Sequence, residues 1–331
     1  MKPTVHTPVL LATSVSMMNV GARPGAWFCD ATYGGGGHTD FIMSRGGRVL
    51  AIDRDMDAIE RGRERHAREI ADGKLRLVHA RHGDLRAVAE SEGISVFDGI
   101  LMDLGISSDQ LEPGKGFSFT HADPVDFRMC ANDPLSGADI LATWSEAELT
   151  RIFKDFGDEK NARQVARGLC RARAQSPDKL RNTASLAKLV ESLAGGRRGL
   201  SKHPATRVFQ SFMYATNDIV GELEKALAAS LDLLSPGAGR LAILSYESVT
   251  DGTVKHTFLR HAGKRVSLQA GGSEWQGELP ALEILTRHPV LPTEDEVREN
   301  PRSRSAKLRA ARKLSGEETA LLTQPARRAA P

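Results

Sequence analysis

Three aspartates and a run of glycines have the types and spacing to bind a nucleoside that carries positive charge. In chain order they are Asp30, then Gly34, Gly35, Gly36 and Gly37 ending at His38, then Asp53 and Asp103. Contiguous glycines let the backbone approach a ligand closely, and a carboxylate such as that of Asp53 can accept hydrogen bonds from ribose hydroxyls. We therefore expect Asp30, the glycine run, Asp53 and Asp103 to lie together.

The negative charge of this group of residues indicates which kind of nucleotide ligand it would bind. Dinucleotide-binding folds carry G-x-G-x-x-G, with the pyrophosphate at a helix N-terminus. Here the glycines are contiguous and Asp30 precedes them. A carboxylate there would repel a pyrophosphate, but it suits an ammonium and a sulfonium group. The pattern favours S-adenosylmethionine (SAM) over NAD, and the alternative is a glycine-rich surface turn that binds nothing.

Short apolar segments that precede the aspartates predict the strands that position them. These segments are residues 26–29, 48–53, 75–79 and 97–103, and helical stretches follow them. They predict a doubly wound α/β domain, in which ligands bind beyond the carboxyl ends of parallel strands. After Asp103, Gly105 permits close approach and Ser107, Ser108 and Gln110 supply neutral donors and acceptors. A helix cap or a turn is the alternative role for Asp103.

Strand patterns stop after residue 110 and return beyond residue 203. Strand-like segments recur at 240–246, 265–269 and 282–286. We predict one α/β domain, made of residues 1–110 and 204–300, interrupted by a helical basic insertion at 111–203. Residues 301–331, rich in Arg, Ala, Lys and Pro, are predicted to form a loosely ordered basic tail.

Positive charge is concentrated in two places, although the net charge is only +3. Between Lys160 and Arg207 there are twelve Lys or Arg residues and two acidic ones, and a second basic cluster spans Arg302–Lys313. Arg163, Arg167 and Arg171 recur every four residues and predict a stripe on one helix face. Such concentrations on a near-neutral protein indicate a nucleic acid partner, with solvated helix faces as the alternative.

Four other residues are candidates for contact with RNA. Phe117 and Phe119 lie two residues apart beside a glycine, so they either stack on a base or belong to the core of a small domain. Arg207 is expected near a phosphate, at the point where the insertion rejoins the sheet. Arg128 is assigned to the same substrate side.

Composition excludes several classes of protein. Cys29, Cys130 and Cys170 are far apart and form no C-x-x-C pair, which argues against a structural zinc site or a disulfide framework. The N-terminus lacks the apolar core of a secretory signal, and no apolar run approaches the length of a membrane span. We expect a cytoplasmic protein without a metal and without a membrane partner.

The chain resembles a known family along nearly its whole length. The matching blocks are residues 6–11, 30–38, 51–55, 98–111, 116–119, 126–129, 203–207, Phe209-Gln210, Asn217 and 300–309. The block Asp98-Gly-Ile-Leu-Met-Asp-Leu-Gly-Ile-Ser-Ser-Asp-Gln-Leu111 and the block Asn300-Pro-Arg-Ser-Arg-Ser-Ala-Lys-Leu-Arg309 are the most specific. These blocks are similar to those of the RsmH (MraW) group of SAM-dependent 16S rRNA methyltransferases.

The resemblance implies a class I (Rossmann-like) methyltransferase fold with a helical insertion. It also implies transfer of a methyl group from SAM to the N4 amino group of a decoding-centre cytidine of 16S rRNA, in the small ribosomal subunit. Carried over by position, the implied cofactor contacts are Gly36, Gly37, His38, Asp53, Asp103 and Gln110. A further family contact, usually Phe, falls on His82. The oligomeric state stays open, with a homodimer as one option.

The implied reaction needs a proton acceptor near the target amine. The exocyclic amine of cytosine is a poor nucleophile because its lone pair is delocalised into the ring. We expect Asp103, or the loop 105–108 with Ser107 and Ser108, to accept its proton, while the base is turned out of its stack.

Departures from the family pattern gather on the expected substrate side, apart from His82 among the cofactor contacts. They are His82, Cys130, Met213, Tyr214, Tyr246 and Glu247. Two alternatives to the implied function stay open. One is a diverged paralogue that methylates a different RNA or DNA site, and the other is a non-catalytic ribosome-assembly factor.

Overall fold

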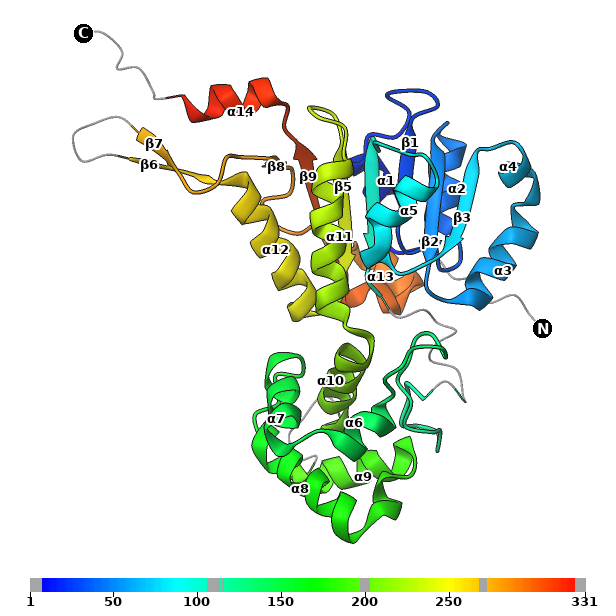
Figure 1. The fold of residues 1–331 in the computed structure, drawn as a ribbon, viewed down its shortest axis with the longest axis vertical. Helices are drawn as coiled ribbons and strands as arrows, with labels where there is room; N and C mark the ends of the chain where they lie inside the picture. Colours follow the sequence, from blue (N-terminus) through cyan, green and yellow to red (C-terminus); the bar gives the residue numbers. More distant parts are fainter. Residues whose placement is uncertain (1–7, 106–113, 115, 197–202, 268–272, 325–331) are drawn as a thin grey trace. The chain divides into compact units, whose positions relative to one another are not determined.

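The computed structural model describes residues 8–105, 114, 116–196, 203–267 and 273–324. The chain divides into two compact units, one made of Met1–Gly105 and Gly221–Pro331, the other of Ile106–Val220. Each unit has its own hydrophobic core. Figure 1 draws both, with the helices of the second unit in green.

The first unit is built on a seven-stranded sheet with the order β3-β2-β1-β4-β5-β9-β8. Its strands are β1 (Trp27–Asp30), β2 (Arg48–Asp53), β3 (Leu75–His79), β4 (Gly99–Asp103), β5 (Arg240–Ser245), β8 (Leu282–Ile284) and β9 (Lys307–Lys313). Strands β1 to β5 are parallel, whereas β9 is antiparallel to β5 and to β8. The predicted doubly wound α/β class is confirmed. The strand order reverses between β1 and β4, which is where such sheets bind ligands.

Helices cover both faces of this sheet. They are α1 (Leu11–Met17), α2 (Gly37–Ser44), α3 (Met56–Arg65), α4 (Ala67–Ala71), α5 (Leu85–Ser91), α11 (Ile219–Leu233), α12 (Ser248–Ala262), α13 (Glu294–Glu299) and α14 (Gly316–Thr323). Two 3-10 turns, η1 (His82–Asp84) and η4 (Pro301–Ser305), and the hairpin of β6 (Lys264–Ser267) with β7 (Ser273–Gln276) complete the unit. Among the described residues, no helix is long and apolar enough to cross a bilayer.

Alternate residues of the central strands pack into two separate cores. Leu50 and Ile100 belong to the core shared with α5, α11 and α12. Val49 and Leu101, their neighbours in sequence, belong to the core shared with α1, α2 and α3. This alternation follows from the period of two along a strand. Because both faces are buried, the parallel strands read as continuous apolar runs, which is why they could be located from sequence.

The second unit is helical. Its elements are α6 (Gly137–Thr143), α7 (Glu146–Asp155), α8 (Ala162–Gln175), η3 (Pro177–Leu180), α9 (Thr183–Leu193) and α10 (Ala205–Asn217). Ser136, Ser145 and Asn182 begin three of these helices with capping boxes, in which the side chain accepts from the third backbone N–H. The unit extends past the predicted end at residue 203, because Val208 and Phe212 of α10 are buried in its core.

The prediction of a loosely ordered tail after residue 300 was wrong for residues 307–313. This segment is β9, which pairs with β5 from Arg240↔Arg312 to Ser245↔Lys307, and Figure 1 shows it beside β5. Arg309 is buried, and its Nε lies 2.6 Å from Asp251 Oδ1 on α12, while Lys307 Nζ lies 3.3 Å from Oδ2. Much of the second basic cluster therefore stabilises the sheet instead of facing a partner.

We predict that Asp251→Asn lowers the free energy of unfolding by about 3 kcal/mol, because it leaves the buried Arg309 without its counter-charge. Burial alone would raise the pKa of Asp251, but Arg309 and Lys307 outweigh it and hold the pKa below its usual range. The folded-state pKa is thus depressed, so the stabilisation is present above about pH 4 and is lost as pH falls through the folded value.

Urea denaturation followed by circular dichroism at pH 7 and at pH 3 measures both effects. The matched control is Asp295→Asn, which breaks an ion pair with Arg298 whose side chains are 80% and 75% exposed. It should cost at most about 0.5 kcal/mol. Equal losses in the two variants at pH 7 would contradict the anchoring role of Asp251.

Candidate active site

The carboxyl ends of three neighbouring strands bring Asp30, Asp53 and Asp103 to one edge of the sheet. Asp30 ends β1, Asp53 ends β2 and Asp103 ends β4. Strand β1 lies between the other two, so Asp30 is central. Asp30 and Asp103 flank the point where the strand order reverses. The sequence predicted this grouping, and the structure places the three residues accordingly.

The glycine run forms a tight turn into α2. Gly36 has φ +78° and begins the helix as its N-cap, and a Cβ on it would lie 2.7 Å from the hydroxyl of Tyr33. A Cβ on Gly37 would lie 2.1 Å from Cγ of Pro8. Only glycine therefore fits at these two positions, one because of its backbone conformation and both because of close packing.

Asp53 holds this turn against β2. Its Oδ2 accepts from the Gly34 N–H at 2.7 Å, and its Oδ1 accepts from the Asp55 N–H at 2.8 Å. Arg65 of α3 donates to the Gly35 carbonyl at 2.8 Å from the other side. Burial raises the pKa of Asp53, and the two backbone N–H groups partly oppose this. Each carboxylate oxygen still has a second lone pair for a ligand hydroxyl.

Asp30 is buried completely. Its Oδ2 accepts from the Thr39 hydroxyl at 2.7 Å, and its Oδ1 accepts from the Thr32 N–H at 3.3 Å. Burial raises the pKa of Asp30, and His38, Thr39 and Thr32 oppose that rise. Its carboxylate thus braces the segment that leads into the glycine turn, in addition to placing negative charge beneath it.

Asp103 is held by two neighbouring strands. Its backbone N–H donates to the Thr32 hydroxyl oxygen at 2.6 Å, and its Oδ1 accepts from the Tyr246 hydroxyl at 2.8 Å. Sequence reasoning did not identify Thr32 or Tyr246 as partners of Asp103. The signal was their position, because each follows the end of a strand that neighbours β4.

Two buried imidazole nitrogens at this edge lack a hydrogen-bond partner among the described residues. They are Nε2 of His38, in the first turn of α2, and Nε2 of His82, in η1 after β3. Burial lowers the pKa of His82 to about 4, although the nearby Glu222 carboxylate opposes this, so His82 is neutral at neutral pH. Such orphaned ring nitrogens beside a glycine turn fit a nucleoside with polar edges.

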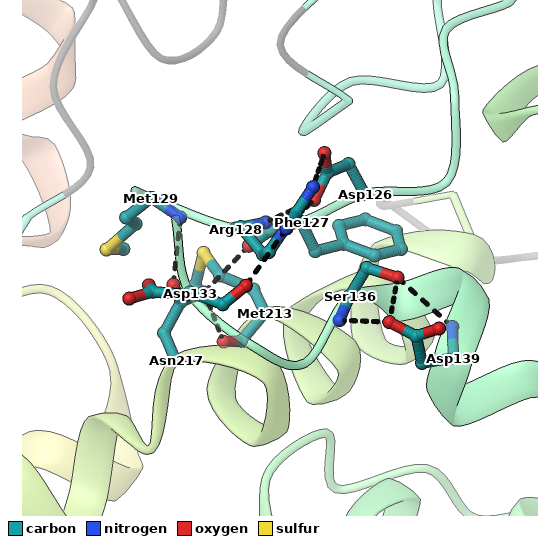
Figure 2. A network of polar contacts seen from close by, with 9 residues as sticks. All are labelled: Asp126, Phe127, Arg128, Met129, Asp133, Ser136, Asp139, Met213 and Asn217. Atoms are coloured by element: carbon teal, nitrogen blue, oxygen red, sulfur yellow. Dashed lines mark hydrogen bonds and ion pairs between the residues drawn. The ribbon is translucent and has the colours of Figure 1, made fainter. Parts of the chain in front are cut away.

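In the second unit, the segment Asp126–Met129 is a strained and tightly bonded loop. Figure 2 shows Asn217 beneath it: its side chain accepts from the Met129 N–H at 2.9 Å and donates to the Phe127 carbonyl at 2.7 Å. Phe127 has φ +62° and is buried, which is unusual for a bulky residue. Arg128 donates to Asp126 through Nε at 2.6 Å and Nη2 at 3.0 Å, and to the Asp133 carbonyl.

The other residues assigned to RNA lie in two kinds of environment. Phe119 packs on His203 and Phe209, with ring centroids 4.7 and 5.2 Å away, so it belongs to the core alternative. Arg163 and Arg167 are 75% and 55% exposed and share the single carboxylate of Glu146. Arg171 and Arg207 are exposed, and Phe117 is half-buried. Ser107, Ser108 and Gln110 lie outside the described residues.

The comparison that decides the family covers both units. The model of the MraW methylase family matches residues 3–314. The chain belongs to this family. It is accordingly a SAM-dependent methyltransferase, and in doubly wound sheets ligands bind beyond the carboxyl ends of the strands, where the strand order reverses.

Relatives of similar length support the same assignment. Proteins named Ribosomal RNA small subunit methyltransferase H are 41% identical in Thermomicrobium roseum, over 94% of each chain, and 38% identical in Carboxydothermus hydrogenoformans, over 94% of this chain and 98% of the relative. A solved structure of an rRNA methylase from Streptococcus thermophilus has a TM-score of 0.42 at 12% identity, covering 94% of this chain and 99% of that one. A likeness at that level says nothing about activity.

We predict that Asp53→Ala weakens SAM binding by about 10- to 150-fold, which corresponds to the loss of a charged hydrogen bond worth about 1.5–3 kcal/mol. The variant loses both an acceptor for ribose hydroxyls and the bond that holds Gly34. Isothermal titration calorimetry with SAM measures the effect.

The control for this measurement is Asp55→Asn. It removes a neighbouring charge but keeps a good N-cap for α3, whose first turn bonds to the Asp55 side chain. Its affinity should stay within about threefold of wild type, because a solvated charge contributes little. A folded Asp53→Ala protein with wild-type affinity would rule out the role of Asp53.

Proposed function

We propose that this protein transfers the methyl group of SAM to the N4 amino group of a cytidine in 16S rRNA, in the small ribosomal subunit. One observation carries the proposal: the likeness to small-subunit rRNA methyltransferases extends through both the sheet unit and the helical unit. A shared cofactor alone would require only the sheet. The cytoplasm is the expected compartment, since that is where small subunits are assembled.

In this function, each group at the sheet edge has a role in binding the cofactor. Asp53 accepts from the ribose hydroxyls, and Gly35, Gly36 and Gly37 let the backbone approach the ligand. His38 and His82 offer ring nitrogens to its polar edges. Asp30 and Asp103 supply the negative charge that attracts an ammonium and a sulfonium, and Gln110 joins them. When bound, SAM supplies a methyl group that the sulfonium has already activated.

On the substrate side, the residues must align a weak nucleophile and remove one proton. In-line alignment of the amine with the methyl group is the larger task, because the lone pair must leave conjugation with the ring. Asp103, or a group of the loop 105–108 with Ser107 and Ser108, accepts the proton after the new bond is largely formed. Asp103 is the better supported of these, since Thr32 and Tyr246 hold it in place.

We propose that the exposed face of the helical unit binds the RNA backbone. A groove of about 570 Å³ between α7 and α8 is lined by three cations, Arg151, Lys154 and Arg163, and by two carboxylates, Glu146 and Asp155. The stripe of Arg163, Arg167 and Arg171 continues along α8, and Arg207 adds a fourth exposed arginine. Arg128 is bound bidentately to Asp126, so we assign it to the loop and not to a phosphate. Phe117 stays a candidate for base stacking.

We predict that the purified protein transfers label from [methyl-³H]SAM to N4 of cytidine in 30S particles from a strain that lacks it. Transfer to short naked RNA should be at least tenfold slower, because the particle supplies a preformed surface for the basic face. Nucleoside analysis of the labelled rRNA identifies the product.

Each other product would point to a different function. Label on adenosine, on a cytidine carbon or on DNA would indicate a diverged paralogue. No transfer, despite SAM binding and tight binding to 30S particles, would indicate an assembly factor. Particles from the parent strain are the control, since their target should already be methylated.

We predict that replacing Arg163, Arg167 and Arg171 together with Gln weakens RNA binding and flattens its salt dependence. Each lost phosphate contact should reduce the slope of log K against log salt by about 0.7–0.9. SAM affinity should not change. Filter binding over a range of KCl concentrations measures the slope.

A charge-matched control separates contact from net charge. The triple change of Arg63, Arg68 and Lys74 to Gln removes the same charge from exposed positions of the sheet unit. It should leave the slope within about 0.5 of wild type. Equal slopes for both triple variants would mean that the stripe is a solvated helix face.

A further inference from the structure

Tyr246 lies against the candidate proton acceptor. It directly follows β5, which pairs with β4 so that Asp103 stands opposite Leu244. Its hydroxyl donates to Asp103 Oδ1 at 2.8 Å, and Oδ2 of Asp103 has no hydrogen bond among the described residues. The two carboxylate oxygens are therefore not equivalent: one is engaged by the protein, and the other is available.

The surroundings of the Tyr246 hydroxyl keep it protonated, so that it donates the hydrogen bond to Asp103. Its ring packs on the backbone of Gly105, where an added Cβ would lie 3.0 Å from Cε2 of Tyr246. Burial, and then the charge and hydrogen bond of Asp103, raise the pKa of Tyr246 far above its usual value. The proton thus stays on the Tyr246 oxygen at every pH at which the enzyme would be assayed, and it points to a carboxylate that can only accept.

Asp103 is fixed at two levels by these contacts. Its backbone is tied to Thr32, whose own N–H donates to Asp30 Oδ1, so the ends of β1 and β4 are linked. Within the part of the chain that the structure describes, its side chain is tied only to Tyr246, after the end of β5. Removal of the Tyr246 hydroxyl would leave the main chain in place and free the carboxylate to rotate about its side-chain bonds.

We propose that Tyr246 is a positioning residue that acts through Asp103: by binding Oδ1, it directs Oδ2 to the cofactor and the target amine. This inference rests on the proposed function of Asp103. A carboxylate held in one orientation does not have to lose rotational freedom as the reaction proceeds, so the effect should appear in kcat. Tyr246 itself touches no reacting atom in this scheme.

The test is a double-mutant cycle of Tyr246→Phe and Asp103→Asn, assayed on 30S particles. Phe keeps the ring that packs on Gly105 and removes only the hydroxyl. Tyr246→Phe should lower kcat about tenfold, the size expected for loss of a hydrogen bond to a charged group, with KM for the particle within twofold of wild type. In the Asp103→Asn background the same change should lower kcat by less than threefold, because the charged partner is gone.

Ser235→Ala is the matched control for a purely structural effect. The Ser235 hydroxyl donates to Asp98 Oδ1 at 2.7 Å, just before β4, so it is a hydroxyl–carboxylate bond at the opposite end of the same strand. This variant should lose thermal stability to a similar degree as Tyr246→Phe and keep wild-type kcat. A comparable fall of kcat in both variants would mean that Tyr246 acts through stability alone and would overturn the proposal.

Two further results would overturn it. One is wild-type kcat in Tyr246→Phe, and the other is the same loss factor in both backgrounds of the cycle. Wild-type kcat in Asp103→Asn would overturn both the role of Asp103 and that of Tyr246. If the wild-type protein methylates no 30S particle, the proposed function fails, and the cycle is then read from SAM affinity by calorimetry, where the same non-additivity is expected.

Discussion

The hydrogen bond from the Gly34 amide to the Asp53 carboxylate is the interaction on which the candidate site depends. It joins the turn after β1 to the end of β2, so the glycine run keeps its shape before any ligand arrives. The N-cap conformation of Gly36 and the close packing of Gly37 on Pro8 then orient the first turn of α2. Without this bond, the turn would be an ordinary glycine loop, whose conformational freedom would have to be lost on binding. Asp53 thus shapes the candidate site before any ligand binds.

Gathering carboxylates at one edge has an electrostatic consequence. Burial raises the pKa of both Asp30 and Asp53, so their charged forms are disfavoured in the protein without a ligand. Among the described residues, the Thr39 hydroxyl and backbone amides donate to these carboxylates, and His38 opposes the rise of the Asp30 pKa. A ligand that carries an ammonium and a sulfonium would relieve the remaining unfavourable field, whereas a pyrophosphate would add to it. The same physical effect that makes the edge costly to fold makes it selective for a cation.

The parts of the fold that could be predicted are those that depend on residues close together in the sequence. Buried parallel strands are continuous apolar runs, and the acids that end β1, β2 and β4 mark the candidate site without further information. Strand β9 was not predicted from the sequence. Its apolar residues, Leu308, Ala310 and Ala311, are interspersed with cations, and this composition is typical of a basic tail. Arg309 is neutralised by Asp251, 58 residues earlier, and no local pattern reports such a pairing. The contact of Tyr246 with Asp103 was missed for the same reason, since it depends on which strands become neighbours.

The arginines of the helical unit show why a count of charges does not define a binding surface. Arg173 donates to the carbonyls of Leu141, Ala142 and Trp144 at the end of α6, so its charge stabilises a helix terminus. Arg128 is bound to Asp126 within the strained loop that Asn217 supports. Arg163 and Arg167, in contrast, share one carboxylate at 3.5–3.6 Å and stay largely exposed, a weak pairing that a phosphate can replace at little cost. The exposed face of α8 thus carries arginines whose weak pairing leaves them able to exchange partners, unlike Arg128 and Arg173.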